Sequence, residues 1–263
     1  MNLTTKKQFE ACLSLSSENH YLASYNGLHF NSVFQPIFGT SLEIVGVEAL
    51  VRIKDRWGNP IRPDLYFNSD EIDIDEKIDV ERLTRVIHIR NFSVSQYRKK
   101  NLFLNVLPAA GEFFADDSET SRLLARRLQE LRIDPEQIVM ELVEIESQNT
   151  KLLSHGLTKL KDDGFKVAID DFGARASTEE RVRLINPSIL KLDRGLLLDY
   201  MNGNKAALSH GISLAKEVGA QTVVEGIETK EQLDAMLELP IDMFQGYFLA
   251  MPEAMTPELK AAI

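Results

Sequence analysis

Several apolar runs in the sequence contain one acidic, amide or lysine residue, the kinds of side chain that bind metal ions or phosphate. The runs are IVGVEAL, NLFLNV, IVMELVE, KVAIDDFG, ILKLD, VVEGIE and, less regularly, MFQGY. Carboxylates that converge repel one another unless a cation neutralises them. Oxygen ligands without His or Cys favour a hard ion such as Mg²⁺ or Mn²⁺. The polar members of the runs are Glu48, Asn105, Glu141, Asp170, Asp171, Lys191, Glu225 and Gln245.

The elements that must position these residues are strands. Apolar runs of this length are typical of buried strands in a parallel sheet, and a helical stretch fits between most pairs of them. Repeated strand–helix units indicate an α/β barrel, whose active sites lie at the C-terminal ends of the strands. The chain has 263 residues, enough for one barrel of about 250 residues. We therefore predict one barrel in which these polar residues meet at one mouth.

The predicted elements follow the chain in order. Residues 1–30 are polar and weakly helical, and we expect a helical extension packed on a barrel that spans residues 31–263. Residues 54–78 resemble a loop, with two prolines, a glycine and many acids. Strands are expected at 31–39, 42–53, 101–108, 137–146, 166–173, 187–197 (with an exit loop), 221–227 and 241–252. Helices are expected at 79–100, 118–133, 150–164, 177–186, 204–220 and 229–240.

Composition excludes some classes of function. The net charge of -10 argues against non-specific binding of nucleic-acid polymers, which needs a basic face. A small phosphorylated ligand is still allowed, because a bound metal reverses the local charge. The single cysteine, Cys12, permits no intrachain disulfide. No stretch reaches the roughly 20 apolar residues of a membrane span, and the first residues lack the apolar core of a signal peptide. We expect a cytoplasmic protein, unless the chain is part of a larger one.

The motif EALVR at residues 48–52 resembles the signature of EAL-domain cyclic di-GMP phosphodiesterases. The similarity continues through QPI at 35–37, NVL at 105–107, ELVE at 141–144, DDFG at 170–173, KLD at 191–193, EGIET at 225–229 and QGYFLAMP at 245–252. Each short motif alone is weak, whereas eight in the order and spacing of the family are specific. The resemblance implies a modified TIM (β/α)8 barrel that hydrolyses cyclic di-GMP to the linear dinucleotide pGpG.

The resemblance also implies roles for individual residues. One Mg²⁺ or Mn²⁺ ion would be held by Glu48, Asn105, Glu141 and Asp170, and a second by Asp170, Asp171 and Glu225. Paired ions clamp the attacking and leaving oxygens of a phosphoryl displacement. Catalytic roles fall to Lys191, Glu225 and Glu48, and substrate contacts to Gln35, Leu50, Arg52, Lys191 and Gln245. Glu144 would anchor the loop after DDFG.

The sequence departs from the family pattern in the loop DDFGARAST. Arg175 stands where glycine is usual in the family, and Ala176 stands where an aromatic residue is usual. We therefore expect lower activity than in members with the usual loop. We also expect an altered contact in a possible homodimer. The departure leaves every proposed metal ligand in place.

Three alternatives accompany the enzyme hypothesis. The barrel could be a catalytically weak or inactive module that acts as a receptor for cyclic di-GMP or as a protein-interaction domain. It could also be another acid-lined, Mg²⁺-dependent barrel, such as an enolase-type lyase. Any one buried glutamate could merely pair with an arginine, as Glu48 could with Arg52, but lysines and arginines at these strand ends are too few to pair with all the carboxylates.

Overall fold

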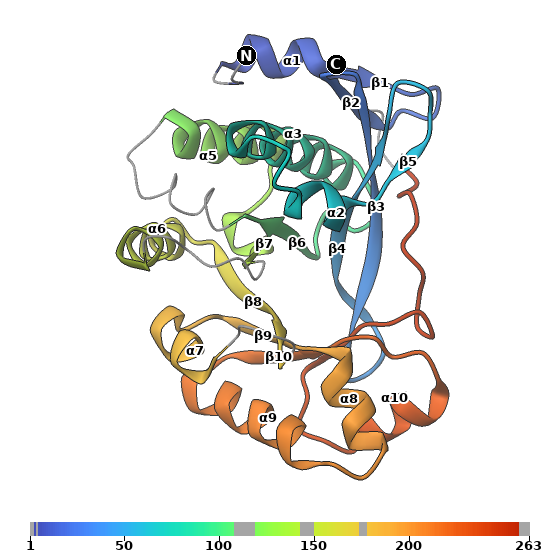
Figure 1. Cartoon of the computed structure of the whole chain (residues 1–263), viewed down its shortest axis with the longest axis vertical. Helices are drawn as coiled ribbons and strands as arrows, with labels where there is room; N and C mark the ends of the chain where they lie inside the picture. The colour runs from blue at the N-terminus through green and yellow to red at the C-terminus, as the bar shows by residue number, and fades with distance from the viewer. Residues whose placement is uncertain (1–2, 4, 108–118, 143–149, 174–177, 258–263) are drawn as a thin grey trace.

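Eight strands close into a barrel in the computed structural model of the chain (Figure 1). The structure describes residue 3 and residues 5–107, 119–142, 150–173 and 178–257. Neighbouring strands follow the order β3-β11-β10-β9-β8-β7-β6-β4, and a further pairing of β3 with β4 closes the ring. The predicted barrel is thereby confirmed. Its strands are β3 (Leu28–Gly39), β4 (Ile44–Lys54), β6 (Asn101–Val106), β7 (Ile138–Leu142), β8 (Lys166–Phe172), β9 (Ile189–Leu192), β10 (Gln221–Val224) and β11 (Met243–Phe244).

One barrel strand runs against the others. β3 is antiparallel to both of its neighbours, β4 and β11. The remaining pairs of the barrel are parallel, as the continuous apolar runs predict. β3 and β4 form a hairpin that needs only the short turn between Gly39 and Ile44, so no crossover helix lies between them. This hairpin is the modification of the regular (β/α)8 pattern.

Helices follow most of the parallel strands and cover the outside of the barrel (Figure 1). A large apolar core, which includes Phe92, Leu128, Leu157 and Met236, fills the space between helices and strands. The helices are α2 (Pro63–Asn68), α3 (Ile74–Ser93), α5 (Glu119–Leu131), α6 (Thr150–Asp162), α7 (Glu179–Ile185), α8 (Arg194–Met201), α9 (Ala206–Val218) and α10 (Lys230–Leu237), with the 3-10 turn η1 (Pro135–Gln137) before β7.

The first residues are only partly the predicted helical extension. Helix α1 (Lys6–Cys12) begins with a capping box between Thr5 and Gln8. The chain then forms the strands β1 (Leu13–Leu15) and β2 (Tyr21–Tyr25), which pair with each other, and β2 continues the sheet beside β3. Alternating burial along β2 explains the strand, because Tyr21 and Ala23 pack into a second core that the short apolar stripe of the sequence did not reveal.

Three other segments differ from the prediction. Within residues 54–78, predicted as loop, lie β5 (Pro60–Ile61), α2 and the start of α3. The exit loop predicted after β9 is helix α8, capped by Asp193, which accepts a hydrogen bond from the backbone N–H of Gly195 at 2.7 Å. The closing strand is only two residues long. Beyond it, the N–H groups of Gln245 and Phe248 donate to the carbonyls of Val224 and Ile227.

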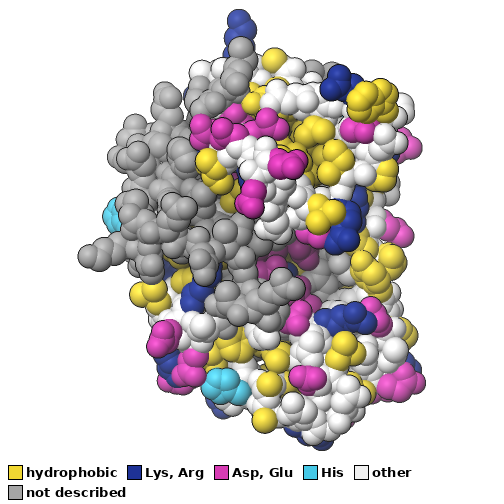
Figure 2. All heavy atoms as spheres, in the orientation of Figure 1, with side chains coloured by type: hydrophobic (Ala, Val, Ile, Leu, Met, Phe, Trp, Pro, Cys, Tyr) yellow, Lys and Arg dark blue, Asp and Glu magenta, His cyan; other side chains and the backbone are white. Residues whose placement is uncertain are grey.

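The exposed surface mixes residue types. On the face shown in Figure 2, hydrophobic side chains are interspersed with charged ones. None of the helices in the described part of the chain is long and apolar enough to cross a membrane. The predicted homodimer and the cytoplasmic location stay predictions.

A close backbone approach next to the barrel mouth requires a glycine at position 246. The N–H of Ile227 donates to the carbonyl of Gln245 at 3.1 Å, and the N–H of Phe248 donates to the carbonyl of Ile227 at 3.0 Å. A Cβ atom on Gly246 would lie 2.1 Å from the carbonyl oxygen of Ile227 and 2.3 Å from its nitrogen. Backbone atoms cannot rotate away as a side chain can, so any larger residue would separate the segments that carry Glu225 and Gln245.

We predict that Gly246→Ala lowers the free energy of unfolding by about 3 kcal/mol, the upper range for overpacking. The matched control is Gly219→Ala, at a helix end with φ of 73° and nothing within 4 Å of the added Cβ. In that variant the alanine must only adopt the left-handed backbone conformation, which lowers the free energy of unfolding by about 1 kcal/mol. Urea unfolding of both variants measures the difference, and equal losses would contradict the steric argument.

Candidate active site and metal centre

The inward side chains of the barrel form two layers. The lower layer is apolar and consists of residues from seven strands that pack together: Ile37, Phe103, Val139, Ala168, Ile189, Val223 and Met243. Side chains two residues apart on a strand point the same way, so the next inward positions lie directly above this layer. Those positions hold the polar residues of the predicted site. We call them the polar ring: Gln35, Glu48, Asn105, Glu141, Asp170, Lys191, Glu225 and Gln245.

The antiparallel direction of β3 explains how Gln35 and Glu48 join the ring. Gln35 precedes Ile37 by two residues, and because β3 runs in the reverse direction this places it above the apolar layer. Gln35 pairs with Glu48 in the register of β3 and β4, so both side chains emerge on the same face. Asn105 and Glu141 pair in the same way between β6 and β7. Each of the eight barrel strands thus carries one member or, for Glu225 and Gln245, is directly followed by it. The sequence predicts that these residues meet at one mouth, but it does not predict that β3 runs in the reverse direction.

Lys191 is the single cation of the ring and lies among its carboxylates. Its Nζ atom is 2.9 Å from Oε1 of Glu141, 2.8 Å from Oδ1 of Asp170 and 2.8 Å from Oε1 of Glu225. Glu48 is farther away, at 3.8 Å. The lysine side chain is only 1% exposed. Burial acts to lower the pKa of Lys191, but the carboxylates outweigh it and raise that pKa well above its usual value. The group therefore stays an ammonium.

Two carboxylates of the ring hold their protons unusually tightly. Burial raises the pKa of Glu141 well above its usual value, and the charges of Glu48 and Asp170 add to this effect although Lys191 opposes it. Burial likewise raises the pKa of Glu225 to about 8. The charges of Asp170 and Glu48 add to this effect, and the charge of Lys191 opposes it. Four carboxylates around one ammonium leave surplus negative charge in the ring, and protons are one way to remove it.

Glu48 is held by amides on both sides. Its Oε1 atom accepts a hydrogen bond from Nδ2 of Asn105 at 3.1 Å, and its Oε2 atom accepts one from Nε2 of Gln245 at 2.8 Å. Arg52, the alternative partner considered from the sequence, donates instead to the carbonyl of Val51 at 3.1 Å. Because Asn105 donates its NH₂ group to Glu48, its Oδ1 atom faces away from that bond as a potential ligand.

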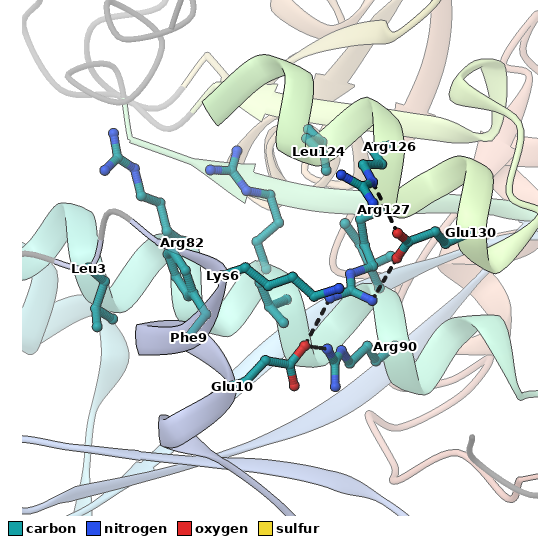
Figure 3. Close-up of a pocket in the computed structure, with 13 residues that line it drawn as sticks. Leu3, Lys6, Phe9, Glu10, Arg82, Arg90, Leu124, Arg126, Arg127 and Glu130 are labelled. Carbon is teal, nitrogen blue, oxygen red and sulfur yellow. Dashed lines mark hydrogen bonds and ion pairs between the residues drawn. The ribbon is translucent and has the colours of Figure 1, made fainter. Parts of the chain in front are cut away.

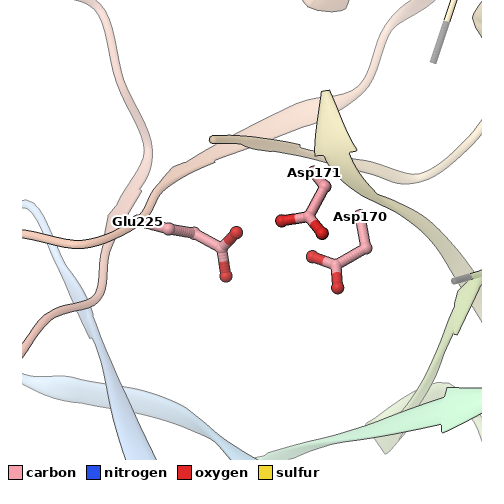
Figure 4. Close-up of side chains that lie close together, drawn as sticks. All are labelled: Asp170, Asp171 and Glu225. Atoms are coloured by element: carbon pink, nitrogen blue, oxygen red, sulfur yellow. The ribbon is translucent and has the colours of Figure 1, made fainter. Parts of the chain in front are cut away.

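The consecutive residues Asp170 and Asp171 point toward one place because the strand is irregular. Neighbouring residues of a regular strand point to opposite faces, but the register of β8 with β9 shifts between Ile169 and Phe172. Asp171 has φ of 53°, a left-handed conformation that aspartate tolerates better than most residues. Figure 4 shows both carboxylates facing that of Glu225, and one oxygen from each residue lies within 4.8 Å of the others.

The donor set fits a hard divalent cation. All the candidate ligand atoms are carboxylate or amide oxygens, which Mg²⁺ and Mn²⁺ accept. Glu141 provides a specific observation. Its side chain is fully buried, and Lys191 pairs with Oε1 at 2.9 Å, but within the described residues Oε2 has no hydrogen-bond donor. A buried oxygen in this state needs a cation or a proton.

A cavity of about 490 Å³ opens beside the ring and could hold a substrate. Glu48, Leu50 and Arg52 line it from alternate positions of β4, together with Asn105 and Asp171. These residues were all predicted from the sequence. Gln35 and Gln245 lie at the ring itself. Nε2 of Gln35 donates to the carbonyl of Ala250 at 3.3 Å, and Oε1 of Gln245 is buried without a hydrogen-bond donor within the described residues.

Sequence analysis missed the contribution of α2 and α3 to this cavity. Asp64 and Phe67 of α2 lie in a segment predicted as loop. Four polar residues of α3 also line the cavity, at positions i, i+3, i+4 and i+7, the spacing of one helix face. That spacing was a usable signal, because it places four polar side chains on one face of the helix. They are Glu81, Thr84, Arg85 and His88.

Some predicted residues lie outside the part of the chain that the structure describes. They include Glu144, the predicted loop anchor, and Arg175 and Ala176 of the atypical loop. Their roles stay predictions.

Comparison with known proteins identifies the family. The family description "EAL domain" matches residues 21–252, most of the chain. The chain therefore belongs to the EAL domain family. It is 26% identical over 238 residues to the cyclic di-GMP phosphodiesterase PdeF of Escherichia coli, an alignment that covers 88% of this chain and 31% of that protein. It is 27% identical over 217 residues to the cyclic di-GMP phosphodiesterase RocR of Pseudomonas aeruginosa, covering 80% of this chain and 53% of that protein. The chain thus spans well under two thirds of the length of these relatives.

Solved structures confirm the fold. A standalone EAL protein from Vibrio cholerae, bound to cyclic di-GMP, has a TM-score of 0.74 at 21% identity and covers 88% of this chain and 94% of its own. The YkuI protein of Bacillus subtilis, in complex with cyclic di-GMP and calcium, has a TM-score of 0.73 at 24% identity and covers 85% of this chain and 56% of its own. At these identities the likeness establishes the barrel and leaves the chemistry to the residues of the ring.

The titration of Glu225 predicts a pH dependence of stability. Its pKa is raised from 4.5 to about 8 in the folded protein, mainly by burial. Between these pH values the folded state keeps a proton that the unfolded chain releases, so stability is full below pH 4.5 and falls as pH rises toward 8. We expect the metal-free protein to lose on the order of a few kcal/mol across this window.

Denaturant unfolding in EDTA, from pH 5 upward, measures this loss. Glu225→Gln carries no titrating proton at this position and should make the profile less steep, because only Glu141 then keeps a raised pKa among the two. Glu238→Gln, the same change at an exposed position, should leave the profile as in the unmodified protein. Identical slopes in all three proteins would show that Glu225 does not titrate in this range.

Proposed function

We propose that the chain is a metal-dependent phosphodiesterase that hydrolyses cyclic di-GMP to linear pGpG. The observation that carries the proposal is the polar ring, in which four carboxylates, one lysine and three amides meet above an apolar layer. All the ligands that the family resemblance implies are present in it or directly beside it. The names of PdeF and RocR, and cyclic di-GMP in the structures of related barrels, support the choice of substrate.

The proposed ligand sets are those that the family resemblance implies. Glu48, Asn105, Glu141 and Asp170 would hold one divalent ion, and Asp170, Asp171 and Glu225 a second. Such ions make water a nucleophile near neutral pH and neutralise charge on phosphoryl oxygens. The two buried, proton-retaining glutamates would give up their protons when a cation arrives, because metal ligation requires the carboxylate form.

The chain's own residues would position the substrate. Arg52 lies four residues from Glu48 on the same face of β4, where its planar guanidinium can bind a phosphate with two parallel hydrogen bonds. Leu50 supplies an apolar contact between them. Lys191 remains an ammonium, so it acts by donating to an oxygen that gains charge in the transition state rather than by accepting a proton.

The first prediction for this proposal concerns turnover. Purified protein with cyclic di-GMP and Mg²⁺ or Mn²⁺ should form pGpG, and EDTA should stop the reaction, because the ligands are all oxygens. Chromatography of the nucleotides measures the product. Asp170→Ala, which removes a ligand shared by both ions, is the matched inactive control. Full turnover in excess EDTA would refute the metal-dependent mechanism.

A second function is a receptor for cyclic di-GMP with little or no turnover. The observation that favours it is the position of Lys191, whose three short ion pairs neutralise part of the ring without a metal. In that arrangement the lysine competes with a divalent ion for the same oxygens. Stoichiometric binding of cyclic di-GMP by calorimetry, with no pGpG after prolonged incubation with Mg²⁺ or Mn²⁺, would decide for the receptor.

The second prediction separates the roles of Lys191. Lys191→Met should lower kcat by about a hundredfold or more, since a group that stabilises developing charge acts mainly in the transition state. The affinity for cyclic di-GMP should change much less. Without metal the variant should also be less stable by about 3–5 kcal/mol, because the remaining carboxylates lose their ammonium. Mg²⁺ should restore part of this stability.

Lys161→Met is the matched control for stability. Lys161 is partly buried outside the site and donates to the carbonyls of Ile185 and Asn186, each at 2.7 Å. Its replacement should destabilise the protein to the same extent with and without Mg²⁺. A Lys191→Met protein with unchanged kcat and only a raised KM would assign Lys191 to ground-state binding.

A further inference from the structure

The substrate cavity extends from the barrel mouth into the space between the barrel wall and α3. Alternate residues of β4 and β6 point to opposite faces of the sheet, and residues of both faces line the cavity. Those that point away from the polar ring are apolar. We call the part of the cavity that they line, together with two polar residues of α3, the apolar pocket. It is lined by Ala49, Val51, Leu104, Val106, Thr84 and His88.

The two polar residues of the apolar pocket differ in what they can offer a ligand. The hydroxyl group of Thr84 already donates to the carbonyl of Glu81 at 2.9 Å. His88 is bonded through one ring nitrogen, since its Nδ1 atom lies 2.7 Å from Oγ of Ser32. Ser32 belongs to β3 and is not among the residues that line the cavity. The ring therefore meets the pocket with its other edge, which carries Nε2, and Nε2 has no partner among the described residues.

The ring of His88 is neutral and fixed in orientation. Burial lowers the pKa of His88 from 6.5 to about 3, so the imidazole carries a single hydrogen at the pH of any assay. The ring of Phe34 meets it nearly at a right angle, with the ring centres 6.1 Å apart. Which nitrogen carries the hydrogen decides whether Nε2 donates or accepts.

A chain of hydrogen bonds determines the position of that hydrogen. The backbone N–H of Tyr21 donates to Oδ1 of Asn91 at 2.7 Å, and Nδ2 of Asn91 donates to the carbonyl of Tyr21 at 3.0 Å. A backbone N–H can only donate and a carbonyl can only accept, so the orientation of the amide is fixed. The second hydrogen on Nδ2 is directed to Oγ of Ser32, at 3.4 Å.

Ser32 therefore accepts from Asn91 and keeps its own hydrogen to donate. Within the described residues, Nδ1 of His88 is the acceptor available to it. With the opposite arrangement, the buried hydroxyl group would have no acceptor, a state that costs about 1–3 kcal/mol. Nδ1 is thus the acceptor, the ring hydrogen is on Nε2, and the apolar pocket contains one fixed N–H donor.

Helix α3 is held in place close to this histidine. Glu10 of α1 bonds to Arg90 of α3 and, at 2.9 Å, to Arg127 of α5, and Figure 3 shows the three side chains meeting. The guanidinium carbon of Arg90 also lies 4.9 Å from the centre of the Tyr21 ring. Tyr21 is thereby joined to α3 twice, through Arg90 and through Asn91. A donor on such a frame is already in position before a ligand arrives, which lowers the entropy lost on binding.

We propose that His88 determines base specificity, by donating a hydrogen bond from Nε2 to O6 of a guanine base of cyclic di-GMP bound in the apolar pocket. This inference rests on the proposed function. A flat base suits apolar walls with one donor. A phosphate does not, because a neutral imidazole supplies no charge to offset it, whereas Arg52 at the mouth does.

A donor at this position separates guanine from adenine. Guanine presents two acceptors, N7 and O6, on one edge, whereas adenine has an amino group in place of O6. The Nε2 hydrogen would face the amino hydrogens of adenine, and both donors would be left unpaired in an apolar space. Sites that hydrogen-bond one form of a ligand reject the form that lacks the matching group for this reason.

Binding of cyclic di-GMP and of cyclic di-AMP, measured by calorimetry with Ca²⁺ in place of Mg²⁺ to slow turnover, tests the proposal. His88→Leu should weaken cyclic di-GMP by about tenfold or more and change cyclic di-AMP by less than about threefold. His88→Gln, whose amide N–H can replace that of Nε2, should restore most of the affinity for cyclic di-GMP.

The matched control is His29→Leu. Nδ1 of His29 lies 2.9 Å from Oγ of Ser24, the same kind of pair, but at an exposed position of the β2–β3 hairpin. This variant should bind both dinucleotides as the unmodified protein does.

Proton–nitrogen NMR of the histidine rings tests the donor in the unmodified protein, independently of how well any variant folds. The hydrogen of His88 should be found on Nε2, and its signal should shift when cyclic di-GMP is added. A hydrogen on Nδ1, or no shift on binding, would overturn the proposal.

The calorimetry also separates this inference from the proposed function. If the unmodified protein binds cyclic di-GMP and His88→Leu binds it equally well, the role of His88 is refuted and the proposed function is not. Equal weakening of both dinucleotides in His88→Leu would show a packing role and would likewise refute specificity. If the unmodified protein binds no cyclic di-GMP, the proposed function fails, and this inference fails with it.

Discussion

The mutual repulsion of carboxylates buried at one mouth is the constraint on which the rest of the structure depends. Charges removed from water are unfavourable unless partners are held close and in fixed geometry. Here the partners are one ammonium, at 2.8–2.9 Å from three carboxylates, and amides that donate to a fourth. Such an arrangement persists only on a rigid frame. The closed sheet supplies that frame, and the apolar layer beneath it keeps water from entering the barrel from below.

The geometry of the frame follows from simple rules with two exceptions. The two-residue period of a strand lifts each polar side chain directly above an apolar one. The antiparallel β3 and the irregularity in β8 break the pattern, and both exceptions serve the site. The first brings Gln35 beside Glu48 through a local hairpin. The second turns Asp171 toward Asp170 and Glu225, which a regular strand would direct away.

The sequence predicted the ring better than it predicted the elements around it. One polar residue inside a long apolar run is a strong signal, because burying it is unfavourable unless it has a function, and Glu141 and Lys191 show this most clearly. The short elements escaped prediction because tertiary contacts create them. β2 forms because Tyr21 and Ala23 pack into the second apolar core, and α8 begins where Asp193 caps it. The left-handed turn at Asp171 has no sequence signal beyond the tolerance of aspartate for that conformation.

The hydrogen bond between Gln245 and Glu48 joins residues 197 positions apart in the chain. Glu48 belongs to the β3–β4 hairpin, a set of local contacts whose closure loses little chain entropy. Gln245 arrives only when β11 inserts between β10 and β3, the last gap of the barrel in chain order. Barrel closure and completion of the site are therefore one event. A chain still emerging during synthesis has all the carboxylates of the polar ring but lacks the Gln245 amide that donates to Glu48, so the ring is complete only when β11 is in place.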